Sequence, residues 1–100
     1  MAGCRSSGVL TASAIIFSGS CKLISIHAQL TDTAPVTVKV FDNTAGSGKE
    51  LARIILAADA NGVSPSCIEF DMHGVLCSTG LYLDISTGLG TGAAVSVEYA

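Results

Sequence analysis

Short segments in which apolar and polar residues alternate one by one constrain this chain more than any other feature. A period of two places successive side chains on opposite faces of a β-strand, whereas a helix repeats its apolar residues every three or four positions. The alternation is clearest over residues 24–30, 36–40, 68–73, 81–85 and 93–99. Turn-forming residues, chiefly Gly, Asp, Asn and Ser, separate these segments. The pattern therefore predicts an all-β protein.

Two less regular segments fit the same interpretation. Residues 9–17 contain a weaker strand. Residues 50–57 could form a helix by propensity, but their apolar run is short and the turn at residues 59–62 comes too soon for a typical helix, so a strand is favoured. Residues 75–77 and 81–85 flank a three-residue turn, a spacing that predicts a β-hairpin. The side chains expected to face the core are Ile24, Ile26, Val38, Val40, Ile68, Phe70, Leu83, Val95 and Val97.

One hundred residues suit a single domain, here residues 1–100. We expect an antiparallel β-sandwich of seven or eight short strands, and a jelly roll is one form that it could take. Charged residues make up 13% of the chain, about half the usual share, so part of the exterior is expected to be covered by other subunits. The expected assembly is a homo-oligomer, with a trimer favoured.

The charge pattern and hydropathy argue against two kinds of partner. The formal net charge is −3, and the five Lys and Arg residues are scattered, so no basic patch for a phosphate backbone is expected. No run approaches the roughly 18 apolar residues that span a bilayer. We therefore expect neither nucleic acid nor membrane as a partner.

Four cysteines lie at Cys4, Cys21, Cys67 and Cys77. No secretory leader is evident, so the thiols are expected to be reduced and mostly buried. Cys67 and Cys77 could meet across neighbouring strands, where they would serve as small apolar side chains.

Two glycine-rich segments resemble nucleotide-binding motifs only superficially. A phosphate-binding loop around Gly46–Lys49 would need Gly at position 43 and Ser or Thr at position 50, where the chain has Asn43 and Glu50. The segment at residues 88–93 is followed by an alternating strand, whereas a dinucleotide fold needs a helix there. No cofactor is expected.

The clearest polar cluster is Glu69, Asp71 and His73, which alternate along one predicted strand face. They could converge on a divalent cation, but a solvated or inter-subunit polar face explains the same alternation and is favoured. No nucleophile motif or acid–base pair is recognisable, so the chain is not expected to be an enzyme. A hydrolase activity remains an alternative only if His27, His73 and Asp71 cluster in a pocket.

From residue 36 to residue 99 the chain resembles small structural proteins of tailed bacteriophage virions. The resemblance is carried by residues 37–44 leading into 47–51, by 74–77 and by 80–85. It implies a β-sandwich present in many copies on a particle, as a capsid decoration, fibre or tail-associated subunit, often a trimer. The implied partners are other virion proteins such as the major capsid protein, and the implied location is the virion, assembled in the host cytoplasm.

Loops at the ends of a sandwich are the expected contact surface, since a rigid scaffold presents variable residues there. The loops at residues 42–49 and 87–92 are candidates, although both could be plain hairpin turns. A receptor- or glycan-binding module of a fibre or tail remains the alternative role, disfavoured by the absence of Trp. The candidate contact residues are Asp42, Asn43, Ser47, Gly48, Lys49, Gly90 and Thr91.

Overall fold

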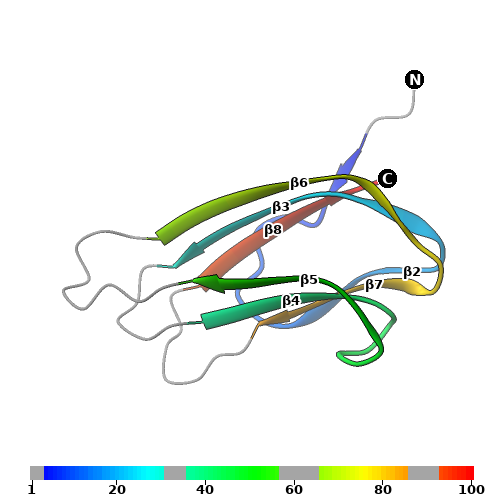
Figure 1. Ribbon diagram of the computed structural model, residues 1–100, viewed down its shortest axis with the longest axis horizontal. Helices are drawn as coiled ribbons and strands as arrows, with labels where there is room; N and C mark the ends of the chain where they lie inside the picture. Colours follow the sequence, from blue (N-terminus) through cyan, green and yellow to red (C-terminus); the bar gives the residue numbers. More distant parts are fainter. Residues whose placement is uncertain (1–3, 31–35, 57–65, 86–92) are drawn as a thin grey trace.

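The protein is a β-sandwich of two stacked four-stranded sheets (Figure 1). The computed structural model describes residues 4–30, 36–56, 66–85 and 93–100, and these residues contain eight strands and no helix. The prediction of an antiparallel β-sandwich is confirmed. The strands are β1 (Arg5–Ser6), β2 (Ala14–Ser18), β3 (Cys21–Leu30), β4 (Val36–Asp42), β5 (Lys49–Leu56), β6 (Ser66–Cys77), β7 (Gly80–Ile85) and β8 (Ala93–Tyr99).

The strand order is that of a jelly roll. One sheet, called sheet A, has the order β1-β8-β3-β6, and the other, sheet B, has the order β2-β7-β4-β5. The first strand pairs with the eighth, the second with the seventh, the third with the sixth and the fourth with the fifth, all antiparallel. The chain is therefore one long nested hairpin wound into two sheets, which is the jelly-roll arrangement.

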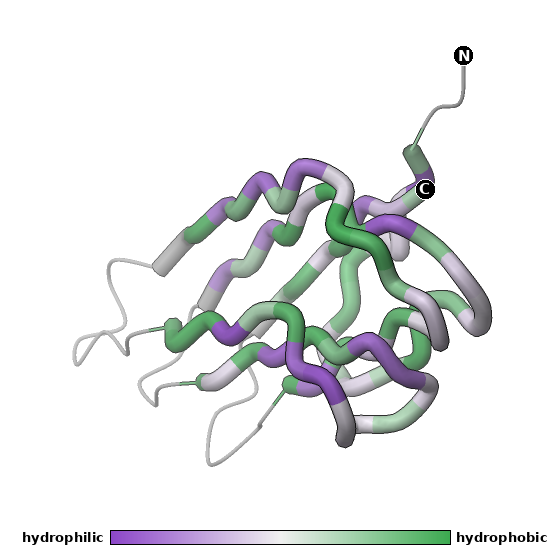
Figure 2. Tube along the Cα trace, turned by 45° about the vertical axis from the view of Figure 1, so that its right-hand side comes forward, coloured by the Kyte–Doolittle hydropathy of each residue, from purple (hydrophilic) through white to green (hydrophobic). Residues whose placement is uncertain are grey.

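The core lies between the two sheets because alternate residues of the central strands point inward. Figure 2 shows hydrophobic and hydrophilic residues alternating along the described strands. Six of the residues predicted to face the core are buried, and Leu23, Ile54, Leu56 and Leu81 join them. The six confirmed positions are Ile26, Val38, Val40, Leu83, Val95 and Val97.

Of the other three predicted core positions, Ile24 and Ile68 are partly buried, and the prediction for Phe70 is wrong because this residue is exposed. Ile24 lies at a β-bulge, where the register of β3 shifts between Leu23 and Ser25, so Leu23 faces the core in its place. Ile68 is partly buried and packs against the core, whereas Phe70 is 40% exposed. Phe70 pairs with the buried Ile26 and shares its face, but it belongs to the edge strand β6 and lacks a neighbour on one side.

The predicted hairpin of residues 75–77 and 81–85 is wrong. β6 continues through Gly74 to Cys77 in sheet A, while β7 belongs to sheet B, so the turn between them carries the chain from one sheet to the other. The irregularity at Gly74 is a bulge and not a strand end, since His73 and Gly74 have positive φ angles of 56° and 82°. A hairpin and an inter-sheet corner use similar turn residues, which is why the sequence pattern did not distinguish them.

Two inter-sheet crossings meet at one end of the sandwich, which we call the crossover end. There the β2–β3 turn donates a hydrogen bond from Gly19 N to Thr79 O of the β6–β7 turn (3.0 Å). The carboxylate of Asp42, at the end of β4, accepts hydrogen bonds from the backbone N–H groups of Ser78 (3.1 Å), Thr79 (2.9 Å) and Gly80 (3.3 Å). Asp42 therefore fixes the turn through which the chain changes sheets.

Candidate functional site

The outer face of sheet A carries the most connected polar cluster among the described residues. Its centre is His27 on β3, a central strand of this sheet. In the strand register, His27 lies opposite Glu69 of β6 on one side and Ser96 of β8 on the other. Three strands that are far apart in sequence thus bring their polar side chains to one patch.

His27 bridges two carboxylates. Its Nε2 lies 2.8 Å from Glu98 Oε1, and its Nδ1 lies 3.4 Å from Glu69 Oε2. A neutral imidazole has one N–H, so only the protonated ring can donate toward both carboxylates at once. All three side chains are at least one-third exposed, and solvent-exposed pairs of this kind contribute little to stability. The cluster is therefore better suited to presenting charge than to holding the fold together.

Glu98 is the most heavily hydrogen-bonded member of the cluster. The hydrogen bond from His27, followed by those from Cys4 and Ser25, lowers the pKa of the Glu98 carboxyl. The same contact acts in the opposite direction on Cys4: its Sγ donates to Glu98 Oε2 at 3.3 Å, and this raises the pKa of the thiol. Glu98 is thus held as a carboxylate and Cys4 as a neutral thiol.

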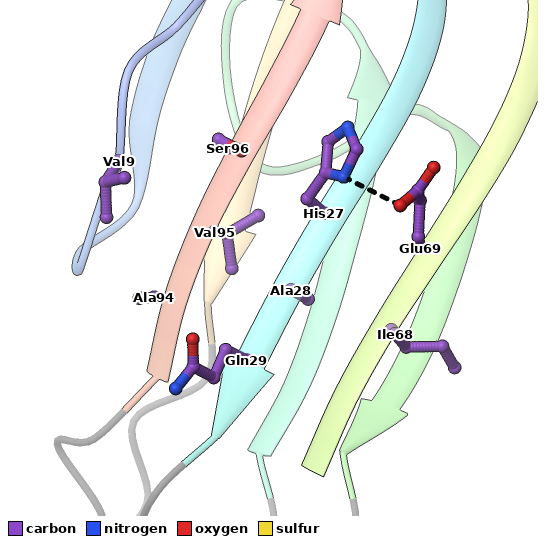
Figure 3. Close-up of a pocket in the computed structure, with 9 residues that line it drawn as sticks. All are labelled: Val9, His27, Ala28, Gln29, Ile68, Glu69, Ala94, Val95 and Ser96. Atoms are coloured by element: carbon purple, nitrogen blue, oxygen red, sulfur yellow. Dashed lines mark ion pairs between the residues drawn. The ribbon is translucent and has the colours of Figure 1, made fainter. Parts of the chain in front are cut away.

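A shallow pocket of about 220 Å³ lies beside His27 on the same face (Figure 3). Its polar side chains are Gln29, Ser96 and the His27–Glu69 pair, and they come from β3, β8 and β6. Val9 forms one wall from the segment that precedes β2. None of the described lining residues is Phe, Tyr or Trp; these residues are Val9, His27, Ala28, Gln29, Ile68, Glu69, Ala94, Val95 and Ser96.

The geometry around His27 does not activate a nucleophile. Ser25 Oγ lies 3.3 Å from His27 Nε2, but Glu98 is closer to the same nitrogen, and Ser25 is only 9% exposed. A general base needs a free nitrogen toward the hydroxyl that it deprotonates. His73 and Asp71, the other members of the hydrolase hypothesis, contact each other on β6, with Nδ1 3.5 Å from Oδ1. The arrangement offers hydrogen bonds and charge to a ligand.

Glu69, Asp71 and His73, for which a cation site was the less favoured interpretation, do not converge in the structure. Glu69 turns to His27, while Asp71 accepts a hydrogen bond from the backbone N–H of His73 at 2.9 Å. Within the described ranges, no three His, Cys, Asp or Glu side chains are grouped so that they could hold a metal ion. Nor do these ranges contain a helix long and apolar enough to cross a membrane.

The predicted contact loop after β4 is held by its own hydrogen bonds. Asn43 Nδ2 donates to Ser47 O at 2.7 Å, and Asn43 Oδ1 accepts from Thr44 N at 2.8 Å. Gly48 has a φ of 96°, which favours glycine. Asp42 and Asn43 therefore make hydrogen bonds within the protein, whereas Ser47, Gly48 and Lys49 are exposed. The candidates Gly90 and Thr91 lie outside the described residues.

The pKa of the Asp42 carboxyl is lowered, first by the backbone hydrogen bonds from Thr79 and Ser78. A carboxylate that accepts several N–H groups is favoured in its charged form. The residue predicted as a contact is thus a structural cap on the β6–β7 turn.

Sequence reasoning missed the cluster of Ser25, His27 and Glu98 and its neighbour Gln29. His27 and Glu98 are separated by 71 positions in the chain and meet only because β8 lies beside β3. The available signal was weak: polar residues alternate along both strands, but alternation alone does not say which strands are neighbours.

The fold and the cluster define a jelly-roll β-sandwich protein with a polar sheet face. No protein-family model matches the chain, and no curated protein sequence matches it significantly.

Proposed function

We propose that this chain is a structural subunit of a virus particle, and specifically a capsid decoration subunit that binds the major capsid protein as a homotrimer. The observation that carries the proposal is the nested eight-strand topology, because double-sheet jelly rolls are characteristic of viral capsid and lectin domains. The resemblance of residues 36–99 to bacteriophage virion proteins points the same way.

Exposed aliphatic side chains support a role in an assembly. Val9, Leu76, Ile55 and Ile15 are 73%, 72%, 67% and 55% exposed, in a chain of which only 13% is charged. Ile15 and Ile55 lie on β2 and β5, the two edge strands of sheet B. A contiguous apolar patch on an outer face is typical of a surface that another subunit covers.

The ordered loop of residues 43–48 supports a role of this loop in attachment to the particle. Asn43 fixes the loop by two hydrogen bonds, and Ser47 in the loop and Lys49 at the start of β5 are exposed. A loop that is ordered before binding loses less entropy when a partner contacts it.

The direct test is quantitative mass spectrometry of purified virions of the virus that encodes the chain. We expect peptides of this protein in hundreds of copies per particle. A dozen copies or fewer would place it in the tail or portal, and its absence from purified particles would overturn the proposal.

A second test concerns the attachment surface on particles that lack the protein. Ser47→Ala combined with Lys49→Ala is expected to weaken particle binding, while Gly48 is kept because a Cβ there would lie 3.0 Å from Asn43 Nδ2. The matched control is Ser18→Ala combined with Lys22→Ala, two exposed residues on β2 and β3. Equal binding by both double variants would show that the loop is only a turn.

The alternative role, a glycan- or receptor-binding module, is favoured by one observation. The pocket of Figure 3 presents the amide of Gln29, the hydroxyl of Ser96 and the carboxylate of Glu69 on one sheet face. These groups can hydrogen-bond sugar hydroxyls. A glycan array tests this role: binding that is lost in Gln29→Ala supports it, and no bound glycan counts against it.

A further inference from the structure

Two buried cysteines lie opposite each other on the neighbouring strands β3 and β6 of sheet A. Cys21 is the first residue of β3 and Cys77 is the last residue of β6, and the antiparallel register places them directly opposite each other. Both thiols are free, and the two residues are 8% and 2% exposed. Cys67 and Cys77, which could have met across neighbouring strands, both belong to β6, where Cys67 lies opposite Gln29.

The strand register pairs Cys21 with Cys77, and each thiol lies near enough to influence the pKa of the other. Residues directly opposite in an antiparallel pair have Cα atoms about 4.5 to 5.5 Å apart. This separation lies within the range of about 4.4 to 6.8 Å that disulfides span. A bond between the two sulfur atoms therefore requires little movement of the backbone.

The pair borders a surface hollow at the crossover end. Cys21 and Cys77 line this hollow together with Ser20, Lys22, Asp42, Lys49, Leu76, Ser78 and Ala100, and its volume is about 670 Å³. The hollow brings solvent to the edge of the pair, and Cys21 is the more exposed of the two residues.

We propose that Cys21 and Cys77 form a cross-strand disulfide when the protein meets a small disulfide oxidant such as oxidised glutathione. The thiolate of Cys21 attacks one sulfur of glutathione disulfide and releases one glutathione thiolate. Cys77 then attacks the Cys21 sulfur of the mixed disulfide and releases the second. The two S–H bonds give one S–S bond, and the two electrons and two protons end on two molecules of reduced glutathione. The inference does not depend on the role proposed above.

Burial makes this reaction slow at neutral pH. Desolvation raises the pKa of both thiols, and that of Cys77 rises to about 12. Because the thiolate is the attacking species, closure is expected to accelerate as the pH rises from 7 to 9. The reduced pair is thus stable in brief contact with an oxidant and closes on long exposure.

The test uses a full-length Cys4→Ser/Cys67→Ser variant, which keeps only the facing pair. After incubation with oxidised glutathione, intact mass should fall by two hydrogens. Trypsin without reductant should then yield a linked peptide of residues 6–22 and 54–100. The thermal midpoint should rise by about 10 °C, and dithiothreitol should reverse the rise.

The same treatment of Cys4→Ser/Cys67→Ser/Cys77→Ser serves as the control and should give no linked peptide. If the facing pair stays reduced at pH 9 with a native circular dichroism spectrum, or stops at a glutathione adduct, the proposal is overturned.

Discussion

Gly80 shows how closely single residues are packed at the crossover end. A Cβ added there would lie 2.9 Å from the carbonyl oxygen of Phe17 and 3.0 Å from that of Asn43. Both neighbours are backbone atoms and cannot rotate away. Only glycine allows β7 to begin between the β2–β3 corner and the loop after β4.

We expect Gly80→Ala to destabilise the domain by about 1–3 kcal/mol, the usual cost of forcing an extra carbon into a packed site. Denaturant unfolding measures the change. Gly46→Ala is the matched control, since its nearest contact would be the ring of Tyr82 at 3.2 Å, a side chain that can move. Equal stability of Gly80→Ala and the parent would show that the strand start can shift.

Asp42 is one residue through which the stability of the folded protein depends on pH. Its pKa and that of Glu98 are lowered in the folded protein, by the turn N–H groups and by His27 respectively. A carboxyl with a lowered folded pKa stabilises the protein above its unfolded pKa, and this contribution is lost as the pH falls through the folded value. Stability should therefore decline below about pH 4.

Asp42→Asn is expected to lower the thermal midpoint at pH 7 and to flatten its decline between pH 5 and pH 2.5. Thermal unfolding across this range measures both effects. A variant with the same acid sensitivity as the parent would show that other groups control acid unfolding.

At the scale of the strand, burial alternates sharply along β5. Ile54 is 2% exposed and Ile55 is 67% exposed, although the two residues are chemically identical neighbours. Ile54→Asp should unfold the domain, because it places an unpaired charge in the core. Ile55→Asp should leave the circular dichroism spectrum native. Two variants of similar stability would mean that the register of β5 is wrong.

The strands were largely predictable because alternation is a local signal, whereas irregularities within strands were not. The extra residue that moves Ile24 out of the core depends on how β3 pairs with β8, which its own sequence does not encode. The sequence did not predict the polar cluster for the same reason, since His27 and Glu98 come from different strands. Asp42 was recognised as a turn residue, but its carboxylate caps a distant turn at residues 78–80.

At the scale of the molecule, the exterior suggests assembly. The outer faces carry Ile15, Ile55 and Leu76 as exposed apolar side chains, and only 13% of the residues in the chain are charged. We expect a homotrimer, with a mass in solution three times the 10.1 kDa of one chain. Light scattering at micromolar concentration checks this prediction, and a strictly monomeric mass would contradict it.

The nested pairing of strands has a consequence for the order of folding. β4 and β5 are neighbours in sequence, whereas the β1–β8 pair joins Arg5 to Tyr99. Closing a longer loop costs more entropy, so the β4–β5 hairpin should form first and the outer pairs should add in turn. In stopped-flow kinetics, Val40→Ala on β4 should mainly slow folding, and Val97→Ala on β8 should mainly speed unfolding. The opposite assignment would mean that the molecule starts to fold from its outermost strands.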